Sequence, residues 1–338
     1  ALVHVNTSVG RGAAGVDMNA IPAAALKRIE VLRDGAAAQY GSDAIAGVIN
    51  FVLKDAPDGG SANVSYGQTY EGDGETMLAD ANFGFSLGDG GFFNITAEYR
   101  DRGSTDRAGL TGAVQYPLLD NGGACGALDN SGCDPREFDF DRSIFRIGDA
   151  DSTSVSAVVN AELPISDNLN FRVFSVFSDR ENQSAGFYRR ANQFERTVVE
   201  LYPDGFLPVI DTDIEDFSFS AGLNWHRDDG WDLDLSLNHG ANSFQFVTSN
   251  SSNASLGASG PTEADAGTLF ISQDMINFDA VRDFAVGNAS ITLAFGAEYR
   301  EERYKLEAGE LASYVDGGVL NQSCPGCDTN PIAYVPGF

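Results

Sequence analysis

Most of the chain alternates between apolar and polar residues, as β-strands do when one face is apolar and the other polar. In 215–226, for example, phenylalanine, leucine and tryptophan alternate with serine, glycine and asparagine. Similar patterns occupy 78–87, 92–101, 153–163, 231–238 and 290–300, and less regular ones occupy 62–70, 169–178 and 270–284. The sequence from residue 61 onward therefore predicts an antiparallel all-β region of about nine strands.

The predicted connections alternate in length. Short turns fall at 88–91, 164–168, 227–230 and 286–289, with longer connections at 71–76, 103–151, 181–211, 248–267 and from 307 onward. Aromatic residues lie near the predicted strand ends: Tyr66, Tyr70, Phe92, Tyr99, Trp225, Trp231, Phe284 and Tyr299.

The strands of a soluble β-sandwich also alternate between apolar and polar residues, but a sandwich gives no reason for every second connection to be long. The pattern favours a transmembrane antiparallel β-barrel, whose turns are short on one side of the membrane and long on the other. Because such barrels usually have an even strand number, about nine strands indicate an incomplete barrel.

Residues 1–56 have a different, mixed pattern. A glycine-rich stretch is followed by Pro22, which suits the first turn of a short helix. Strands are predicted within 27–33 and 44–54, with a single helical turn at 36–41 between them. Since 57–60 read Pro-Asp-Gly-Gly, a turn or linker separates this small α+β unit from the β-region.

The charge excludes one class of partner. Lys and Arg number 21 against 49 Asp and Glu, which gives a net charge of −28 at pH 7. With no basic stripe to neutralise phosphates, the sequence predicts no binding of nucleic acid.

Four cysteines lie in two predicted long loops, as Cys125 with Cys133 and Cys324 with Cys327. Together they could form a four-thiolate zinc site or two local disulfides. Only the second pair has the close spacing usual for zinc, so two disulfides in an oxidising compartment are the simpler interpretation. We therefore predict no metal site.

Other candidate chemistry is weak. Gly10, Gly12 and Gly15 form a GxGxxG pattern with Asp34 about twenty residues later, but no βαβ alternation follows. The three histidines lie in no HExxH motif and beside no GxSxG serine, and the acidic run at 211–216 lacks EF-hand spacing. The sequence predicts neither an enzyme nor a bound cofactor.

One segment carries a longer signature. It comprises Ile21-Pro22, residues 27–33 (KRIEVLR), Tyr40-Gly41-Ser42, Ala44 and residues 47–50 (GVIN). In order and spacing it resembles the end of the plug domain of TonB-dependent outer-membrane receptors, which typically reads IP…IERIEVLRGP…YGS.A.GGVINI.TK. The chain departs from this pattern at Asp34-Gly35, where the family commonly has Gly-Pro, and at Ala46.

The resemblance implies a plug inside a wide barrel, which would otherwise leave a water-filled lumen. Residues 1–56 would be the C-terminal part of the plug, and 61–338 the N-terminal part of the barrel with long extracellular loops. The TonB box and a barrel-closing strand are not seen, so we expect a fragment. Plug-motif positions with structural or plug–barrel roles would be Arg28, Glu30, Arg33, Tyr40, Gly41, Gly47 and Asn50.

The resemblance also implies a function and a location. The protein would lie in the outer membrane of a Gram-negative bacterium as a monomeric barrel, in contact with lipid, TonB and a small solute. It would take up a ferric siderophore, cobalamin or an oligosaccharide with energy passed from TonB, and the sequence leaves the solute open. The alternative is a passive porin or adhesin-like barrel without energy coupling, for which a plug signature has no purpose. A signalling receptor would need a further N-terminal domain.

Overall fold

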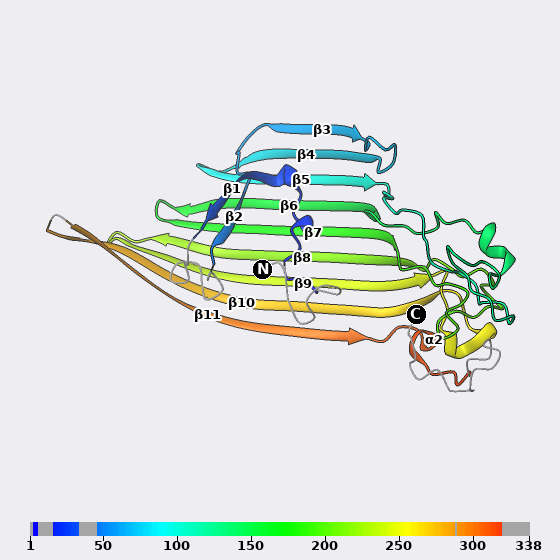
Figure 1. The fold of residues 1–338 in the computed structure, drawn as a ribbon. Helices are drawn as coiled ribbons and strands as arrows, with labels where there is room; N and C mark the ends of the chain where they lie inside the picture. The colour runs from blue at the N-terminus through cyan, green and yellow to red at the C-terminus, as the bar shows by residue number, and fades with distance from the viewer. Residues whose placement is uncertain (1–2, 6–15, 34–45, 288, 320–338) are drawn as a thin grey trace.

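A nine-stranded antiparallel sheet dominates the computed structural model, which describes residues 3–5, 16–33, 46–287 and 289–319 (Figure 1). Each strand pairs with its neighbour in sequence, from β3 at one edge to β11 at the other. The strands are β3 (Gly60–Gly67), β4 (Thr76–Leu87), β5 (Gly91–Arg102), β6 (Asp151–Ser166), β7 (Leu169–Ala185), β8 (Val209–His226), β9 (Trp231–Ser249), β10 (Ala264–Val286) and β11 (Ala289–Glu307). The predicted all-β region of nine strands is confirmed, and we call this sheet the wall.

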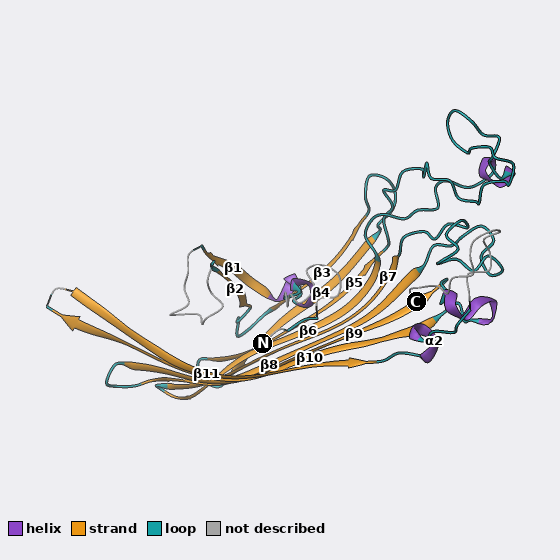
Figure 2. Ribbon diagram, turned by 60° about the horizontal axis from the view of Figure 1, so that its bottom comes forward, coloured by secondary structure: helices purple, strands orange, loops and turns teal. Residues whose placement is uncertain are grey.

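A smaller sheet precedes the wall and lies on its concave, inner face (Figure 2). Its two antiparallel strands are β1 (Leu26–Leu32) and β2 (Val48–Leu53), which match the two strands predicted there. Two 3₁₀ turns, η1 (Met18–Ala20) and η2 (Ala23–Ala25), precede β1, and Pro22 caps the second. We call the described residues before β3 the N-terminal segment. The predicted helical turn at 36–41 and the glycines 10–15 lie outside the described residues.

The two faces of the wall are chemically opposite. Along β8, Asp216 and Ser218 face inward and are each 1 % exposed, whereas the outward-facing Phe217 is 42 % exposed. Large apolar residues cover the outer face on other strands as well: Phe83, Phe85, Phe177, Leu235, Leu237, Leu293 and Phe295. A soluble protein would bury such residues, so this surface suits contact with lipid.

The turns and loops gather at opposite ends of the wall (Figure 1). Tight turns join β4 to β5, β6 to β7, β8 to β9 and β10 to β11, at the four predicted positions. The long loops at the other end carry η3 (Pro135–Phe138), η4 (Ala254–Ser259) and α2 (Leu311–Tyr314). Several strands are longer than predicted, because backbone pairing continues after the alternation ends. At 179–185, for example, β7 pairs with 209–215 of β8 although nearly all of its residues are polar.

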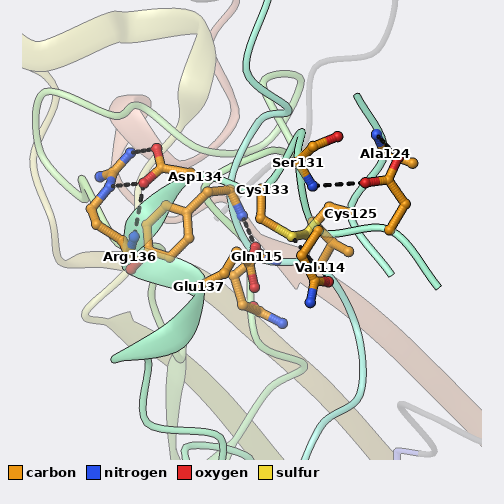
Figure 3. Close-up of a disulfide and its surroundings, with 12 residues drawn as sticks. Val114, Gln115, Ala124, Cys125, Ser131, Cys133, Asp134, Arg136 and Glu137 are labelled. Carbon is orange, nitrogen blue, oxygen red and sulfur yellow. Dashed lines mark hydrogen bonds and ion pairs between the residues drawn. A yellow bond between two sulfur atoms is a disulfide. The ribbon is translucent and has the colours of Figure 1, made fainter. Parts of the chain in front are cut away.

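Two of the long loops support each other. Within 103–150, the buried Glu137 accepts hydrogen bonds from the backbone N–H of Tyr116 at 2.7 Å and from Arg142 at 2.8 Å. The Tyr116 hydroxyl donates to Asp204 in the next loop at 2.9 Å. A disulfide joins Cys125 to Cys133 beside this cluster (Figure 3). Cys324 and Cys327 lie outside the described residues.

The first testable prediction concerns the faces of the wall. On β9 the outward positions run from Trp231 to His239, with Leu235 in the middle and Ser236 facing inward. An arginine at Leu235 of the full-length protein should reduce the free energy of unfolding in lipid by about 2–4 kcal/mol. The matched variant Ser236→Arg keeps its charge in the lumen and should have a small effect. Equal losses in denaturant titrations would contradict the assignment.

A second prediction concerns the cysteines. Mass spectrometry of the protein from an oxidising compartment, without reduction, should recover Cys125 linked to Cys133, and Cys324 linked to Cys327. Reduction should then make the loop 103–150 more sensitive to protease, because the cross-link restricts its unfolded states. Free thiols at all four positions, or one zinc ion per chain, would show that the pairing is wrong.

Candidate functional site

A buried polar cluster on the inner face of the wall is the centre of the candidate site. Asp216 of β8 accepts hydrogen bonds from Arg180 Nη2 of β7 at 2.8 Å and from Asn242 Nδ2 of β9 at 2.7 Å. All three side chains are at least nine-tenths buried. The Asn242 amide oxygen in turn accepts from the backbone N–H of Val5, at 3.0 Å. Three neighbouring strands thus present one connected group of polar side chains to the N-terminal segment.

The N-terminal segment contributes two side chains to this cluster. Asp17 Oδ2 lies 2.6 Å from Arg180 Nη1, and His4 Nε2 lies 2.8 Å from Asp216 Oδ1. His4 and Asp17 also bind each other, since the Asp17 N–H donates to His4 Nδ1 at 2.9 Å. Arg180 therefore joins a carboxylate of the segment to a carboxylate of the wall.

Asp17 remains ionised in this cluster. Burial alone would raise the pKa of its carboxyl, but the backbone amide of Asn19 and the charge of Arg180 outweigh burial and lower that pKa. The pKa of Asp17 in the folded protein is thus below its ordinary value of 3.8. The stabilisation that ionised Asp17 provides is therefore complete above pH 3.8 and is lost as the pH falls through the lowered pKa.

A second polar contact holds the linker, residues 54–59, against the wall. Three inner-face side chains donate to its carbonyls: Asn160 to Lys54 at 3.0 Å, Asn94 to Ala56 at 3.3 Å and Ser86 to Pro57 at 3.0 Å. The backbone N–H of Gly84 on β4 donates to the Gly59 carbonyl at 2.9 Å. A Cβ at Gly84 would lie 2.1 Å from the Ala56 carbonyl oxygen, so only glycine allows this approach. The linker is therefore fixed to β4, β5 and β6.

Apolar contact between the segment and the wall is small by comparison. Among the described residues, the buried apolar cluster consists of Ala25, Val158 and Val176, with the half-buried Leu53 packed against it. Hydrogen bonds and ion pairs thus join the segment to the wall at several places beside this small apolar cluster.

The predicted motif residues lie mainly in the small sheet itself. Glu30 on β1 accepts from Arg28 Nε at 2.6 Å and from Asn50 Nδ2 on β2 at 2.9 Å, and all three are exposed. Arg33 is exposed at the end of β1. Within the described residues, Arg28, Glu30 and Asn50 thus bind one another, and their contacts with the wall stay predictions.

Gly47 has a clear structural role. Its φ is +151°, and a Cβ there would lie 2.4 Å from the Leu32 carbonyl oxygen, so the chain can enter β2 only with glycine at this position. Tyr40 and Gly41 lie outside the described residues.

Sequence reasoning missed the residues that do contact the wall. His4 and Asp17 belong to no recognised motif, and Arg180 lies just after the predicted strand 169–178, in a polar stretch without alternation. Asp216 was the one inward position within a predicted strand, 215–226, and its sequence gave no sign of its partners. In the described ranges, the structure has no helix long and apolar enough to cross a membrane, and no cluster of three or more metal-binding side chains.

Comparisons with known proteins agree with this architecture. The sequence model of the TonB-dependent Receptor Plug Domain matches residues 3–48. The vitamin B12 transporter BtuB of Vibrio vulnificus is 36 % identical over 81 residues, which are 24 % of this chain and 12 % of BtuB.

Solved structures share the fold at low identity. A mutant of the ferric enterobactin receptor PfeA of Pseudomonas aeruginosa matches 93 % of this chain with a TM-score of 0.57 and 16 % identity. The siderophore receptor PirA of Acinetobacter baumannii matches 92 % with a TM-score of 0.55 and 17 % identity. The chain spans 40 % of the length of each. Residues 3–48 thus match the plug domain of TonB-dependent receptors, and the plug-on-wall fold is similar to that of solved receptors of this kind.

Proposed function

We propose that the protein takes up a scarce solute across the outer membrane of a Gram-negative bacterium, with energy passed from TonB. In this proposal residues 1–56 are the end of the plug, and residues 61–338 are part of a monomeric barrel whose long loops are extracellular. The family consists of receptors and not of enzymes, in agreement with the absence of a catalytic motif from the sequence.

The polar contact between plug and wall is the observation that carries the proposal. Each neutral hydrogen bond in it contributes only about 0.5–1.5 kcal/mol, and water can replace it when the plug moves. The wall depends instead on long backbone ladders, such as the one that pairs β10 with β11 from Thr268 to Val286. A partner that pulls on the plug can therefore break plug–wall contacts while the barrel stays intact.

For the solute we keep the three classes that the family resemblance implied: ferric siderophores, cobalamin and oligosaccharides. The names of the relatives support the first two. The loops add an aromatic cluster in which Phe140 and Phe145 pack on Tyr188, with ring centroids 6.1 and 5.6 Å away. Burial, together with the charge of Asp204, raises the pKa of Tyr188 to about 12, so its phenol stays neutral at physiological pH.

The decisive test separates an energised transporter from a passive porin or adhesin-like barrel. Uptake by cells that carry the full-length receptor should stop when TonB is deleted or the proton gradient is collapsed. Deletion of the entire plug, with the barrel retained, should give a leaky channel that requires neither TonB nor the proton gradient. Uptake that continues unchanged without TonB would favour the passive pore.

A further prediction concerns the buried cluster. Arg180→Gln in the full-length receptor leaves Asp17 and Asp216 without their cation, and loss of one partner from a buried pair costs about 3–5 kcal/mol. The plug should therefore leave the wall at a lower urea concentration, as measured by protease access to the plug. The control Arg196→Gln removes a half-exposed loop arginine 3.8 Å from Glu195 and should leave the midpoint unchanged. An unchanged midpoint for Arg180→Gln would contradict a docking role for the cluster.

A further inference from the structure

Both tryptophans of the chain lie on the outer face of the wall, at its turn end, and each ring carries an arginine. Trp225 is next to the last residue of β8, and Trp231 is the first residue of β9. The guanidinium carbon of Arg227 lies 5.0 Å from the Trp225 ring centroid. That of Arg282 lies 5.8 Å from the nearer ring centroid of Trp231. Since a ring face attracts a cation at such distances, the turn end of the outer face holds two guanidinium groups against aromatic rings.

Arg282 lies on the outer face between two described strands. Backbone pairing places it opposite Trp231 of β9 on one side and Leu293 of β11 on the other. Its guanidinium carbon also lies 4.7 Å from the ring centroid of Phe284, two residues nearer the β10–β11 turn. A Cβ at Gly230, in the β8–β9 turn, would lie 3.7 Å from Arg282 Nε. The side chain therefore points toward the turns, with its stem on apolar surface and its charged end at the margin of the apolar belt.

Aromatic side chains surround this charge. The Trp231 ring packs edge-on against Phe284 and Phe295, with centroid distances of 6.2 and 5.7 Å. Phe295 is 53 % exposed, and so is Ile291, opposite Phe284, at 54 %. Tryptophan and other aromatic residues are enriched where hydrocarbon gives way to lipid headgroups. We call Trp231, Arg282, Phe284 and Phe295 the girdle cluster, and its position places the guanidinium of Arg282 at headgroup level.

The two arginines differ in their partners. Arg227 donates through Nε and Nη2 to the two carboxylate oxygens of Asp229, at 3.1 Å each. The hydrogen bond from Arg227 lowers the pKa of Asp229, and the more distant charge of Arg282 adds little. Within the described residues, Arg282 forms no ion pair and its guanidinium donates no hydrogen bond. Since a guanidinium has five N–H donors in a fork that matches phosphate oxygens, Arg282 can engage an anion outside the protein.

We propose that the girdle cluster binds a phospholipid, whose phosphate is bound by Arg282 and whose acyl chains lie along Phe295 and Leu293. A bilayer supplies phosphate at the level of its headgroups, where the charged end of Arg282 lies. In the proposed orientation the turns are periplasmic, so the lipid belongs to the periplasmic leaflet. The inference goes beyond the proposed transport function, because it needs the membrane location of the wall and neither the plug nor TonB.

Quenching of a fluorophore beside Arg282 tests the site in the purified full-length receptor. Ile291→Cys, labelled with bimane, places the probe on the outer face opposite Phe284. The vesicles consist of digalactosyl diacylglycerol, which is neutral and lacks phosphate, with increasing fractions of dibrominated phosphatidylglycerol as the quencher. The site should prefer the phospholipid about tenfold over the matrix lipid, because hydrogen bonds between a guanidinium and a phosphate are charge-assisted. Arg282→Gln should remove that preference.

Matched variants show which property of the site matters. Arg282→Lys keeps a cation and should keep most of the preference, whereas Arg172→Gln removes an inward-facing arginine near the start of β7 and should change nothing. An unchanged preference in Arg282→Gln, or an equal loss in Arg172→Gln, would overturn the inference. Displacement of the phospholipid by inorganic phosphate in the buffer would also overturn it, because the cluster would then bind free anions. TonB takes no part in this measurement, so its outcome is independent of the uptake test.

Discussion

The pairing of backbone N–H and C=O groups between neighbouring strands is the constraint on which the rest of the structure depends. In hydrocarbon an unpaired peptide group costs several kcal/mol, so every strand of the wall must keep its neighbours along the whole apolar belt. Once pairing is continuous, the pleat sends alternate side chains outward and inward. The outward set, such as Phe217 and Phe219, must suit lipid, and the inward set, such as Asp216 and Ser218, is free to be polar. Because the apolar side chains occupy the outward positions, the polar side chains of each strand line the lumen.

A polar lumen determines how the plug can be held. The wall presents serine, asparagine and a few charged side chains, so contacts with the plug are hydrogen bonds and ion pairs with one small apolar patch at Ala25. Such contacts are directional, and they position the plug without the large apolar area that would make docking permanent. The two contacts also differ in kind. The linker is bound through its own backbone carbonyls, whereas the cluster around Arg180 depends on ionised side chains. A force that pulls the plug from the wall would therefore have to break ion pairs at the cluster around Arg180 and backbone hydrogen bonds at the linker.

Period-two patterning predicted the fold well because each strand of the wall carries its own signal. On β9, the alternation of residues 231–238 predicted which side chains point to the outer face of the wall without knowledge of any partner strand. Strand ends were less predictable. At 179–185, polar residues occupy both faces of the strand, so the alternation ends although the backbone pairing with β8 continues. The plug–wall cluster could not be predicted, since it joins His4, Asp17 and Asp216 across about two hundred residues of sequence. Only the curvature of the wall and the path of the linker bring these residues together.

The small size of the inward side chains has a consequence of its own. Serines 218, 220 and 236 face β2, and the described part of the plug touches the wall at the charged cluster, at the linker and at the apolar patch of Ala25, Val158 and Val176. Larger side chains at these positions would add apolar contact, which would make the plug harder to move. Under the proposed transport function, a lumen lined with short hydroxyl side chains keeps the apolar contact with the plug small, so that a pull on the plug can release it.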